Sequence, residues 1–268
     1  MRITIVGCGA IGSKLAKAAD DMPEVKRIYL IDVNRGCAEK LEKELKKAIV
    51  VESVEDELYH CDLVIEAASQ NAAKDILTKS VSRGVDVMVM SVGALVDDDF
   101  RNQTFDKANN SGARIFIPSG ALAGTDALRS ASSDEITSVE LRSTKNPKAL
   151  ADIEYLEKKG IHPSEVTESM ILYSGSAREA VKLFPRNINV AATVSLLGIG
   201  FDKTTVTIIL DPEVKSNNHD LIITGAFGKT ECLTFNVPSP DNPRTSYLAS
   251  LSAISALKRI IRNEWIGI

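Results

Sequence analysis

A glycine-rich turn near the amino terminus constrains the fold of this chain more than any other feature. The residues from Gly7 to Gly12 follow the pattern G-x-G-x-x-G, after an apolar run over 2–6 and before a helical pattern over 13–20. Strand, turn and helix in this order form the phosphate-binding unit of dinucleotide-binding folds. The first glycine permits the tight turn, the second lets the backbone approach the pyrophosphate, and the third allows close packing of helix on strand.

An acidic residue at the end of the second expected strand supports this interpretation. Asp32 follows the apolar run 27–31, twenty residues after Gly12. A carboxylate here hydrogen-bonds to the adenine ribose and repels a 2′-phosphate, so it favours NAD over NADP. Arg35 could still pair with such a phosphate, which keeps NADP possible. The cofactor contacts expected in this region are Gly7, Gly9, Ala10, Ile11, Gly12 and Asp32.

The elements that follow alternate between strands and helices. Continuous apolar runs over 62–67, 86–90 and 114–117 are separated by helical patterns over 35–47, 71–82 and 97–109. Apolar strands joined by helices are typical of a parallel sheet covered on both faces. We therefore predict an α/β fold with an amino-terminal Rossmann domain.

Small residues follow one of these strands, where ligands bind in open α/β sheets. Ala67 and Ala68 are small enough for the nicotinamide half of a cofactor to lie against the backbone, and Ser69 is a candidate substrate contact. Glu66 precedes them and could be a catalytic, helix-capping or ribose-contacting acid. The sequence does not separate these three roles.

Beyond Pro118 the pattern changes to alternating strands. They are expected over 136–143, 169–173, 204–210, 221–224 and 232–237. With the helical pieces between them they predict a second α+β domain on a mixed sheet. An amphipathic helix over 246–263 should pack back on the first domain. The predicted domains are 1–118 together with 244–268, and 119–243.

Charge and cysteine content exclude several classes of protein. The formal net charge is −4 without a basic cluster, so no nucleic-acid partner is expected. No leader pattern or membrane-spanning apolar stretch is seen, so no membrane partner is expected. The four cysteines form no Cys-x-x-Cys pair, which argues against a metal site and favours reduced thiols in the cytoplasm.

A dehydrogenase needs a side chain that moves a proton near the nicotinamide. His60 precedes a strand at its amino end, and His162 lies in a turn, so both should be exposed. His219 lies in a polar run between two expected strands of the second domain. An exposed loop histidine is the plainer interpretation from composition, but its domain is the one expected to carry substrate.

Three polar clusters add candidates, each with a plainer structural alternative. Asn187 and Asn189 could hydrogen-bond to a cofactor carboxamide, although a helix cap also explains them. Arg244 could bind a substrate carboxylate through two hydrogen bonds, beside Thr245 and Ser246 as possible caps. Lys145 could attract an anionic substrate.

Several segments together resemble one known family. They are the Gly7–Gly12 turn, Glu66–Ser69, PSGALAGTDA over 118–127, LFPRNINVAA over 183–192, Asp211-Pro with Asn218-His219, and NPRTS over 242–246. In this order they resemble L-aspartate dehydrogenase along essentially the whole chain. The segment around Arg186 is the most specific of them.

The resemblance implies oxidative deamination of L-aspartate with NAD or NADP. The product iminoaspartate would feed NAD biosynthesis or hydrolyse to oxaloacetate and ammonia. The resemblance makes His219 the catalytic residue, with a pKa near neutrality so that it can accept the ammonium proton, and makes Ala123 and Asn189 cofactor contacts. A homodimer is expected. The alternatives are a homoserine-dehydrogenase-like or dihydrodipicolinate-reductase-like enzyme, or a non-catalytic dinucleotide sensor.

Overall fold

The computed structural model describes residues 1–268 except 151–152, 186–188, 241, 264–265 and 267–268, together with the side chains of 242–244. The described chain divides into two compact units. Unit 1 contains Met1–Pro118 and the last helix from Ser250 onward, and unit 2 contains Ser119–Ala249.

Unit 1 is built on a six-stranded sheet whose paired strands are all parallel. The strand order is β3-β2-β1-β4-β5-β6. The strands are β1 (Arg2–Val6), β2 (Arg27–Ile31), β3 (Ala48–Val50), β4 (Leu63–Glu66), β5 (Asp86–Val89) and β6 (Ile115–Phe116). This arrangement confirms the predicted Rossmann-type fold. Because the order reverses between β1 and β4, the carboxyl ends of these two strands flank a natural ligand crevice.

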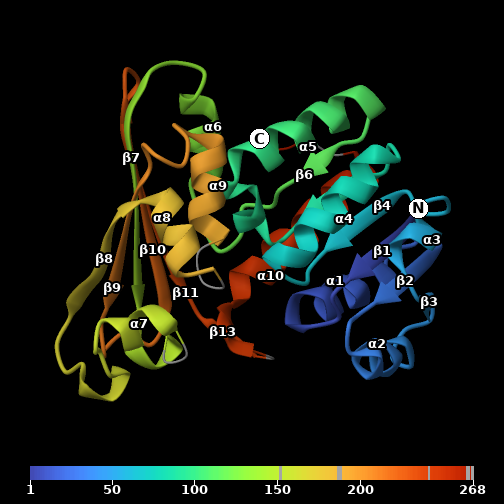
Figure 1. The fold of residues 1–268 in the computed structure, drawn as a ribbon, viewed down its shortest axis with the longest axis horizontal. Helices are drawn as coiled ribbons and strands as arrows, with labels where there is room; N and C mark the ends of the chain where they lie inside the picture. Colours follow the sequence, from blue (N-terminus) through green and yellow to red (C-terminus); the bar gives the residue numbers. More distant parts are fainter. Residues whose placement is uncertain (151–152, 186–188, 241, 264–265, 267–268) are drawn as a thin grey trace. The chain divides into compact units, whose positions relative to one another are not determined.

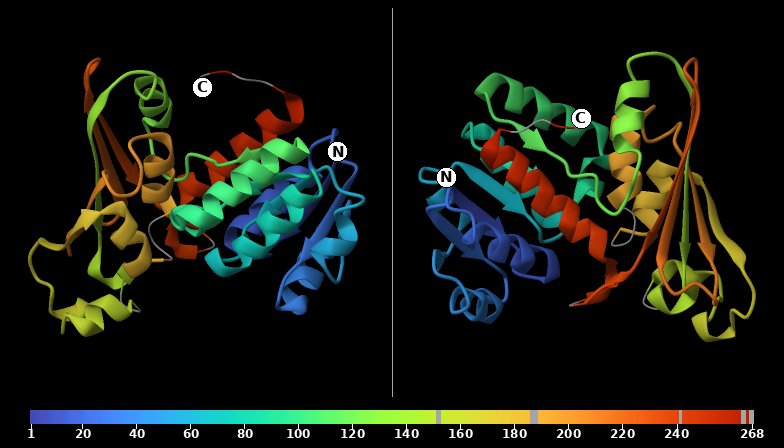
Figure 2. Two further views of the ribbon diagram at one scale, coloured as in Figure 1. Left: turned by 45° about the horizontal axis from the view of Figure 1, so that its top comes forward. Right: turned by 180° about the vertical axis from the view of Figure 1, so that it is seen from behind.

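Helices cover both faces of this sheet (Figure 2). They are α1 (Ala10–Asp20), α2 (Arg35–Glu42), α3 (Val54–Glu57), α4 (Gln70–Ser82), α5 (Asp98–Ser111) and α10 (Tyr247–Arg262), with a short 3₁₀ turn, η1 (Val92–Val96). The apolar faces of α1 and α10 share one buried core with β1, through Leu15, Ala253 and Leu257. Helix α4 packs with α5.

One predicted helix of unit 1 is too long. The helix expected over 35–47 ends at Glu42, and residues 48–50 form the edge strand β3 beside β2. The backbone N–H groups of Lys46 and Lys47 are capped by the carboxylate of Asp20. Tertiary pairing therefore overrides the helical pattern that predicted a longer helix.

Unit 2 is built on a five-stranded mixed sheet, which confirms the second half of the fold prediction. The order is β11-β10-β7-β9-β8, with only β7 and β9 parallel. The strands are β7 (Ile136–Lys145), β8 (Met170–Ser176), β9 (Thr205–Leu210), β10 (Asn217–Gly225) and β11 (Gly228–Asn236). Strand β10 begins four residues before the predicted 221, so the polar run containing His219 is a strand and not a loop.

Helices of unit 2 lie over one face of this sheet, which we call the inner face (Figure 1). They are α6 (Thr125–Ala131), α8 (Ala177–Leu183) and α9 (Asn189–Leu197). Two short helical turns, η2 (Pro147–Leu150) and η3 (Pro163–Glu165), and the helix α7 (Glu154–Lys158) lie between β7 and β8. After β11 the chain forms a small hairpin of β12 (Pro238–Ser239) and β13 (Asn242–Ser246).

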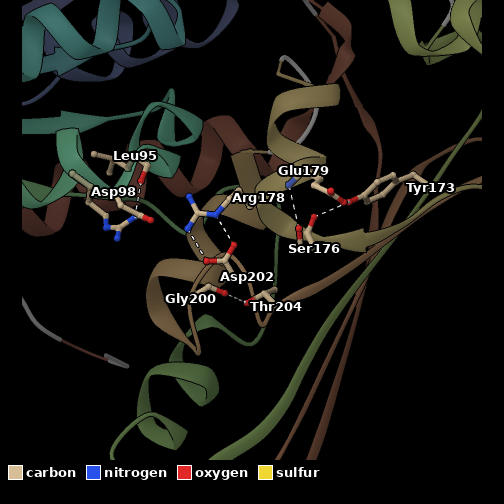
Figure 3. Close-up of polar contacts among 10 residues, drawn as sticks. Leu95, Asp98, Tyr173, Ser176, Arg178, Glu179, Gly200, Asp202 and Thr204 are labelled. Carbon is tan, nitrogen blue, oxygen red and sulfur yellow. Dashed lines mark hydrogen bonds and ion pairs between the residues drawn. The ribbon is translucent and has the colours of Figure 1, made fainter.

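Polar contacts fix α8 at the end of β8 (Figure 3). Ser176 caps the helix by accepting a 3.3 Å hydrogen bond from the N–H of Glu179, and Tyr173 donates to the Ser176 carbonyl at 2.8 Å. Arg178 pairs with Asp202 in the turn before β9. These contacts join β8, α8 and β9 into one rigid edge of unit 2.

Candidate functional site

The three glycines of the fingerprint are required for different reasons. Gly7 has φ +99°, and a Cβ there would lie 2.5 Å from the carbonyl oxygen of Ala67. A Cβ on Gly12 would overlap the carbonyl of Gly7. A Cβ on Gly9 would meet no protein atom within 4 Å, and Gly9 is the N-cap of α1 without a side-chain cap. Open space therefore faces the first turn of α1, at Ala10 and Ile11, where an anion would be stabilised.

Asp32 lies beside this turn at the end of β2. Its carboxylate accepts hydrogen bonds from the N–H of Cys8 at 2.6 Å and of Asn34 at 2.8 Å. Each carboxylate oxygen has two lone pairs, so both can still accept a ribose hydroxyl. Burial and the charge of Asp32 raise the pKa of the Cys8 thiol to about 12, which makes this cysteine unreactive at neutral pH.

Arg35 is engaged by two carboxylates. Its guanidinium donates to Glu39 at 2.8 Å and also pairs with Glu52. These hydrogen bonds raise the pKa of Arg35. A 2′-phosphate at this place would have to compete with both glutamates and would face the charge of Asp32.

Glu66 is fully buried at the end of β4. It accepts hydrogen bonds from the N–H of Ala68 at 2.8 Å, from the N–H of Ser91 at 2.9 Å and from the Ser91 hydroxyl at 2.8 Å. Burial raises its pKa although these donors oppose the shift. These contacts show a role other than the three that the sequence left open. The carboxylate ties the end of β4 to the turn after β5. Ser69 caps α4, accepting from the N–H of Ala72 at 3.3 Å.

A cluster of buried and half-buried polar side chains lies on the inner face of the unit 2 sheet. The antiparallel register places His219 of β10 directly opposite Ser143 of β7 and Thr234 of β11. In the next inward-facing row, Asn217 of β10 lies opposite Asn236 of β11, with Lys145 at the end of β7. We call these residues the inner-face cluster: Ser143, Lys145, Asn217, His219, Thr234 and Asn236. The sequence singled out only Lys145 and His219.

His219 is buried, with 3% of its surface exposed, so the plainer expectation of an exposed loop histidine is wrong. Its Nδ1 lies 2.9 Å from the hydroxyl oxygen of Ser143. Burial, and then the charge of Lys145, lower the pKa of His219 to about 3. A pKa this low keeps the ring neutral at pH 7, whereas the sequence led us to expect a pKa near neutrality. The pKa differs from that expectation because β10 buries the ring on the inner face of the sheet, where the charged form is disfavoured.

Lys145 is also buried, with 7% of its surface exposed. Burial lowers its pKa to about 8. Within the described part of the chain, no carboxylate pairs with its ammonium group. A buried cation without a counter-ion is costly, and such a group is usually matched by an anionic ligand.

The segment before α6 is held over the inner-face cluster by two side chains of β11. Asn236 donates from Nδ2 to the carbonyl of Ala121 at 2.9 Å, and the hydroxyl of Thr234 accepts from the N–H of Ala123 at 3.1 Å. Gly124 has φ +86°, and a Cβ there would lie 2.5 Å from the sulfur of Cys232. Ala123, the expected cofactor contact, is thus fixed to Thr234, the residue that pairs with His219 across β10 and β11.

The remaining candidates are only partly described. Asn189 begins α9, and its carbonyl accepts a 3.2 Å hydrogen bond from Thr193. Asn187 lies outside the described residues. Arg244 lies in β13, and its side chain is outside the described part. In the described chain no group of three or more His, Cys, Asp and Glu could hold a metal ion, and no helix is long and apolar enough to cross a membrane.

Comparison with known proteins shows similarity along the whole chain. The family profile described as Aspartate dehydrogenase, C-terminal, matches residues 126–260, and that described as Homoserine dehydrogenase, NAD binding domain, matches residues 7–118. The L-aspartate dehydrogenase of Methanosarcina barkeri is 43% identical over 100% of this chain and 99% of its own. That of Nitrosopumilus maritimus is 41% identical over 98% of this chain and 97% of its own.

Solved structures show the same similarity. The crystal structure of aspartate dehydrogenase from Thermotoga maritima aligns with a TM-score of 0.75 and 30% sequence identity, over 98% of this chain and 96% of that one. A hyperthermophilic archaeal homoserine dehydrogenase in complex with NADPH aligns with a TM-score of 0.60 at 11% identity, over 98% of each chain. The second likeness concerns the fold alone.

Proposed function

The chain belongs to the L-aspartate dehydrogenase family, and from this premise we propose that it oxidatively deaminates L-aspartate to iminoaspartate with NAD. The observation that carries the proposal is the buried ammonium of Lys145, which has no carboxylate partner among the described residues and lies in the same cluster as His219. A cation that needs an anion, next to a group that can take up a proton, suits an acidic amino acid.

The cofactor is proposed to bind unit 1 through the glycine turn. Gly7, Gly9, Ala10, Ile11 and Gly12 hold the pyrophosphate, and the open space at Gly9 fits a phosphate that approaches the backbone. Asp32 accepts hydrogen bonds from the adenine ribose. Together with the engagement of Arg35, this favours NAD over NADP.

The other proposed cofactor contacts are Ala67, Ala68, Ala123, Asn187 and Asn189. The tie through Glu66 supports Ala67 and Ala68, since it fixes the peptide that these residues share. The anchoring of Ala123 by Thr234 supports that contact.

The two substrate carboxylates need cationic or hydrogen-bonding partners. Lys145 is proposed to pair with one of them, because the pair would neutralise a buried charge. Arg244 is proposed as a second cationic partner, since a guanidinium binds a carboxylate through two parallel hydrogen bonds. Ser69 is proposed as a hydroxyl donor, which is compatible with its accepting role as the cap of α4.

The proposed mechanism begins with the removal of a proton from the substrate amine. The substrate amine must lose a proton before its nitrogen lone pair can form the C=N bond, and Nε2 of His219 accepts that proton. Bound NAD supplies the acceptor for the hydride that leaves the substrate Cα. The carboxylates of aspartate bring negative charge beside His219 and offset the charge of Lys145, so they raise the pKa of His219. After the imidazolium of His219 has released that proton to solvent, the neutral ring can assist the attack of water on the imine carbon.

Steady-state kinetics test this proposal directly. We expect NADH formation with L-aspartate, none with L-homoserine, and a loss of about a thousandfold in kcat/KM for His219→Asn, as for removal of a general base. Activity on homoserine instead of aspartate would favour the homoserine-dehydrogenase-like alternative. NAD binding without turnover of either amino acid would favour a dinucleotide sensor.

We also propose that the protein is a homodimer that forms through the outer face of the unit 2 sheet. Leu233, Phe235 and Ile171 on this face are 59%, 68% and 63% exposed. Arg142 and Glu140 form a 2.7 Å ion pair on the same face. In a symmetric dimer Arg142 of one copy could pair with Glu140 of the other. Apolar side chains that are this exposed are typical of an interaction surface.

The biological setting is proposed from the same chemistry. Iminoaspartate would feed NAD biosynthesis or hydrolyse to oxaloacetate and ammonia. The cysteines are all free, including the exposed Cys37, which suits the reducing cytoplasm.

A further inference from the structure

The imidazole of His219 has a single hydrogen-bond partner in the described structure. That partner is the hydroxyl of Ser143, 2.9 Å from Nδ1. The two residues are paired across β7 and β10, and both side chains are almost completely buried. The ring is therefore held by its Nδ1 edge, and Nε2 is the nitrogen left for a ligand.

The chemistry of a neutral imidazole decides what this contact must do. Only one of the two nitrogens carries a hydrogen. If Nδ1 is bare, Ser143 donates to it and Nε2 carries the hydrogen, so Nε2 cannot accept a proton. If Nδ1 carries the hydrogen and donates it to Ser143, Nε2 is bare and can act as a base. A hydroxyl oxygen can accept from Nδ1 both before and after Nε2 is protonated.

Ser143 is the hydroxyl of this row that contacts the ring in the described structure. Thr234 lies on the other side of His219, and its hydroxyl accepts from the N–H of Ala123 in the segment before α6. On its far side Ser143 pairs with Ile208 of β9, which is apolar and does not compete for the hydroxyl.

We propose that Ser143 is a positioning residue for His219, accepting the Nδ1 hydrogen so that Nε2 is presented to the substrate amine as a base. This inference rests on the proposed role of His219. A neutral hydroxyl also suits the neighbourhood better than the carboxylate that often supports a catalytic histidine. A carboxylate at position 143 would lie two residues from Lys145 on the same face and would neutralise the charge proposed to bind the substrate.

The kinetic test uses Ser143→Ala with Ser143→Thr as the conservative variant. We expect Ser143→Ala to lower kcat with aspartate by at least about tenfold, because a misplaced base loses its alignment. The KM for NAD should stay within about twofold, and Ser143→Thr should recover most of kcat since it keeps the hydroxyl. Wild-type kcat in Ser143→Ala would overturn the inference.

A double-mutant cycle separates positioning from a general packing effect. In a His219→Asn background, Ser143→Ala should cause no further loss, because the residue that it positions is already absent. An equal loss in both backgrounds would show that Ser143 acts through packing and would overturn the inference.

A third measurement does not depend on turnover. The chain has only three histidines, so the ¹⁵N resonances of the His219 ring can be assigned and its protonated nitrogen identified. We expect hydrogen on Nδ1 in the wild type and a shift toward the other tautomer in Ser143→Ala. An unchanged tautomer would contradict the inference. If the wild type failed to oxidise aspartate, the proposed function would fail, and the ¹⁵N result would still decide whether Ser143 sets the tautomer.

Discussion

The buried carboxylate of Glu66 accepts hydrogen bonds from both the backbone N–H and the hydroxyl of Ser91, at 2.9 Å and 2.8 Å. It also accepts from the N–H of Ala68. One side chain thus joins the carboxyl ends of β4 and β5 and fixes the Ala67–Ala68 peptide against Gly7. This peptide is part of the proposed cofactor site, so the carboxylate links strand packing to cofactor binding.

Glu66→Gln should therefore weaken both stability and NAD binding. The amide keeps the volume but turns one acceptor into a donor, which would face an N–H group of Ala68 or Ser91. An unsatisfied buried donor costs about 1–3 kcal/mol. We expect the free energy of unfolding to fall by this amount in denaturant titrations and the Kd for NAD to rise, while exposed Glu157→Gln leaves both unchanged. A wild-type Kd in Glu66→Gln would contradict the link.

Two glycine variants should separate cofactor binding from folding. Gly9→Ala adds a methyl group that meets no protein atom, and the φ of −73° suits alanine. We expect an unchanged Tm but a Kd for NAD at least about tenfold higher, because the methyl group occupies the path of the pyrophosphate. Gly12→Ala should lower Tm, since its methyl group would overlap the carbonyl of Gly7. Normal NAD binding by Gly9→Ala would place the phosphates elsewhere.

Cofactor preference should respond to the glutamates that hold Arg35. Glu52→Gln removes one of the two carboxylates and leaves Glu39 as the partner of Arg35. Exposed ion pairs contribute little free energy, so kcat/KM for NADP should rise only modestly, by at most about fivefold, while that for NAD stays constant. Adding Arg35→Ala should cancel the gain. A gain that persisted without Arg35 would contradict this explanation.

The sequence predicted unit 1 more completely than the inner-face cluster of unit 2, and the reason is physical. The glycine turn and Asp32 depend on local backbone geometry, which a short motif can encode. The cluster depends on register between strands that are distant in sequence, such as β7 with β10. The inward positions of the cluster are polar. A prediction that expects apolar residues at inward positions therefore does not recognise the first part of β10 as a strand. The signal that could have shown the cluster was the spacing of its polar residues. Asn217 and His219 lie two residues apart, as do Ser143 and Lys145, so each pair shares one face of its strand.

The proposed dimer can be tested on one hairpin. Phe235→Asp places a charge on the exposed outer face of β11, whereas Phe227→Asp places it at the turn between β10 and β11. We expect sedimentation velocity to show a monomer for Phe235→Asp and an unchanged dimer for Phe227→Asp. Burying an unpaired carboxylate in an apolar interface is costly, while the turn leaves it in water. A monomeric wild type would contradict the proposal.

Replacing Lys145 should change stability and activity in opposite directions. Lys145→Met removes a buried cation that has no described counter-ion but keeps an unbranched apolar side chain.

The pKa of Lys145 makes the stability effect depend on pH. In the folded state this pKa is about 8, below the ordinary 10.5, so the unfolded chain binds more protons between these values. Stability of the wild type therefore rises with pH through this window, and the full cost of the charge is present at pH 7. We expect Lys145→Met to be more stable at pH 7, on the order of 3 kcal/mol, with the gain vanishing toward pH 10.5. Activity on aspartate should be lost, because the variant cannot neutralise a substrate carboxylate, whereas exposed Lys148→Met should match the wild type in both measurements. A Lys145→Met variant that is less stable at pH 7 would show that the ammonium is already matched in the folded protein, and its proposed pairing with substrate would then lose its driving force.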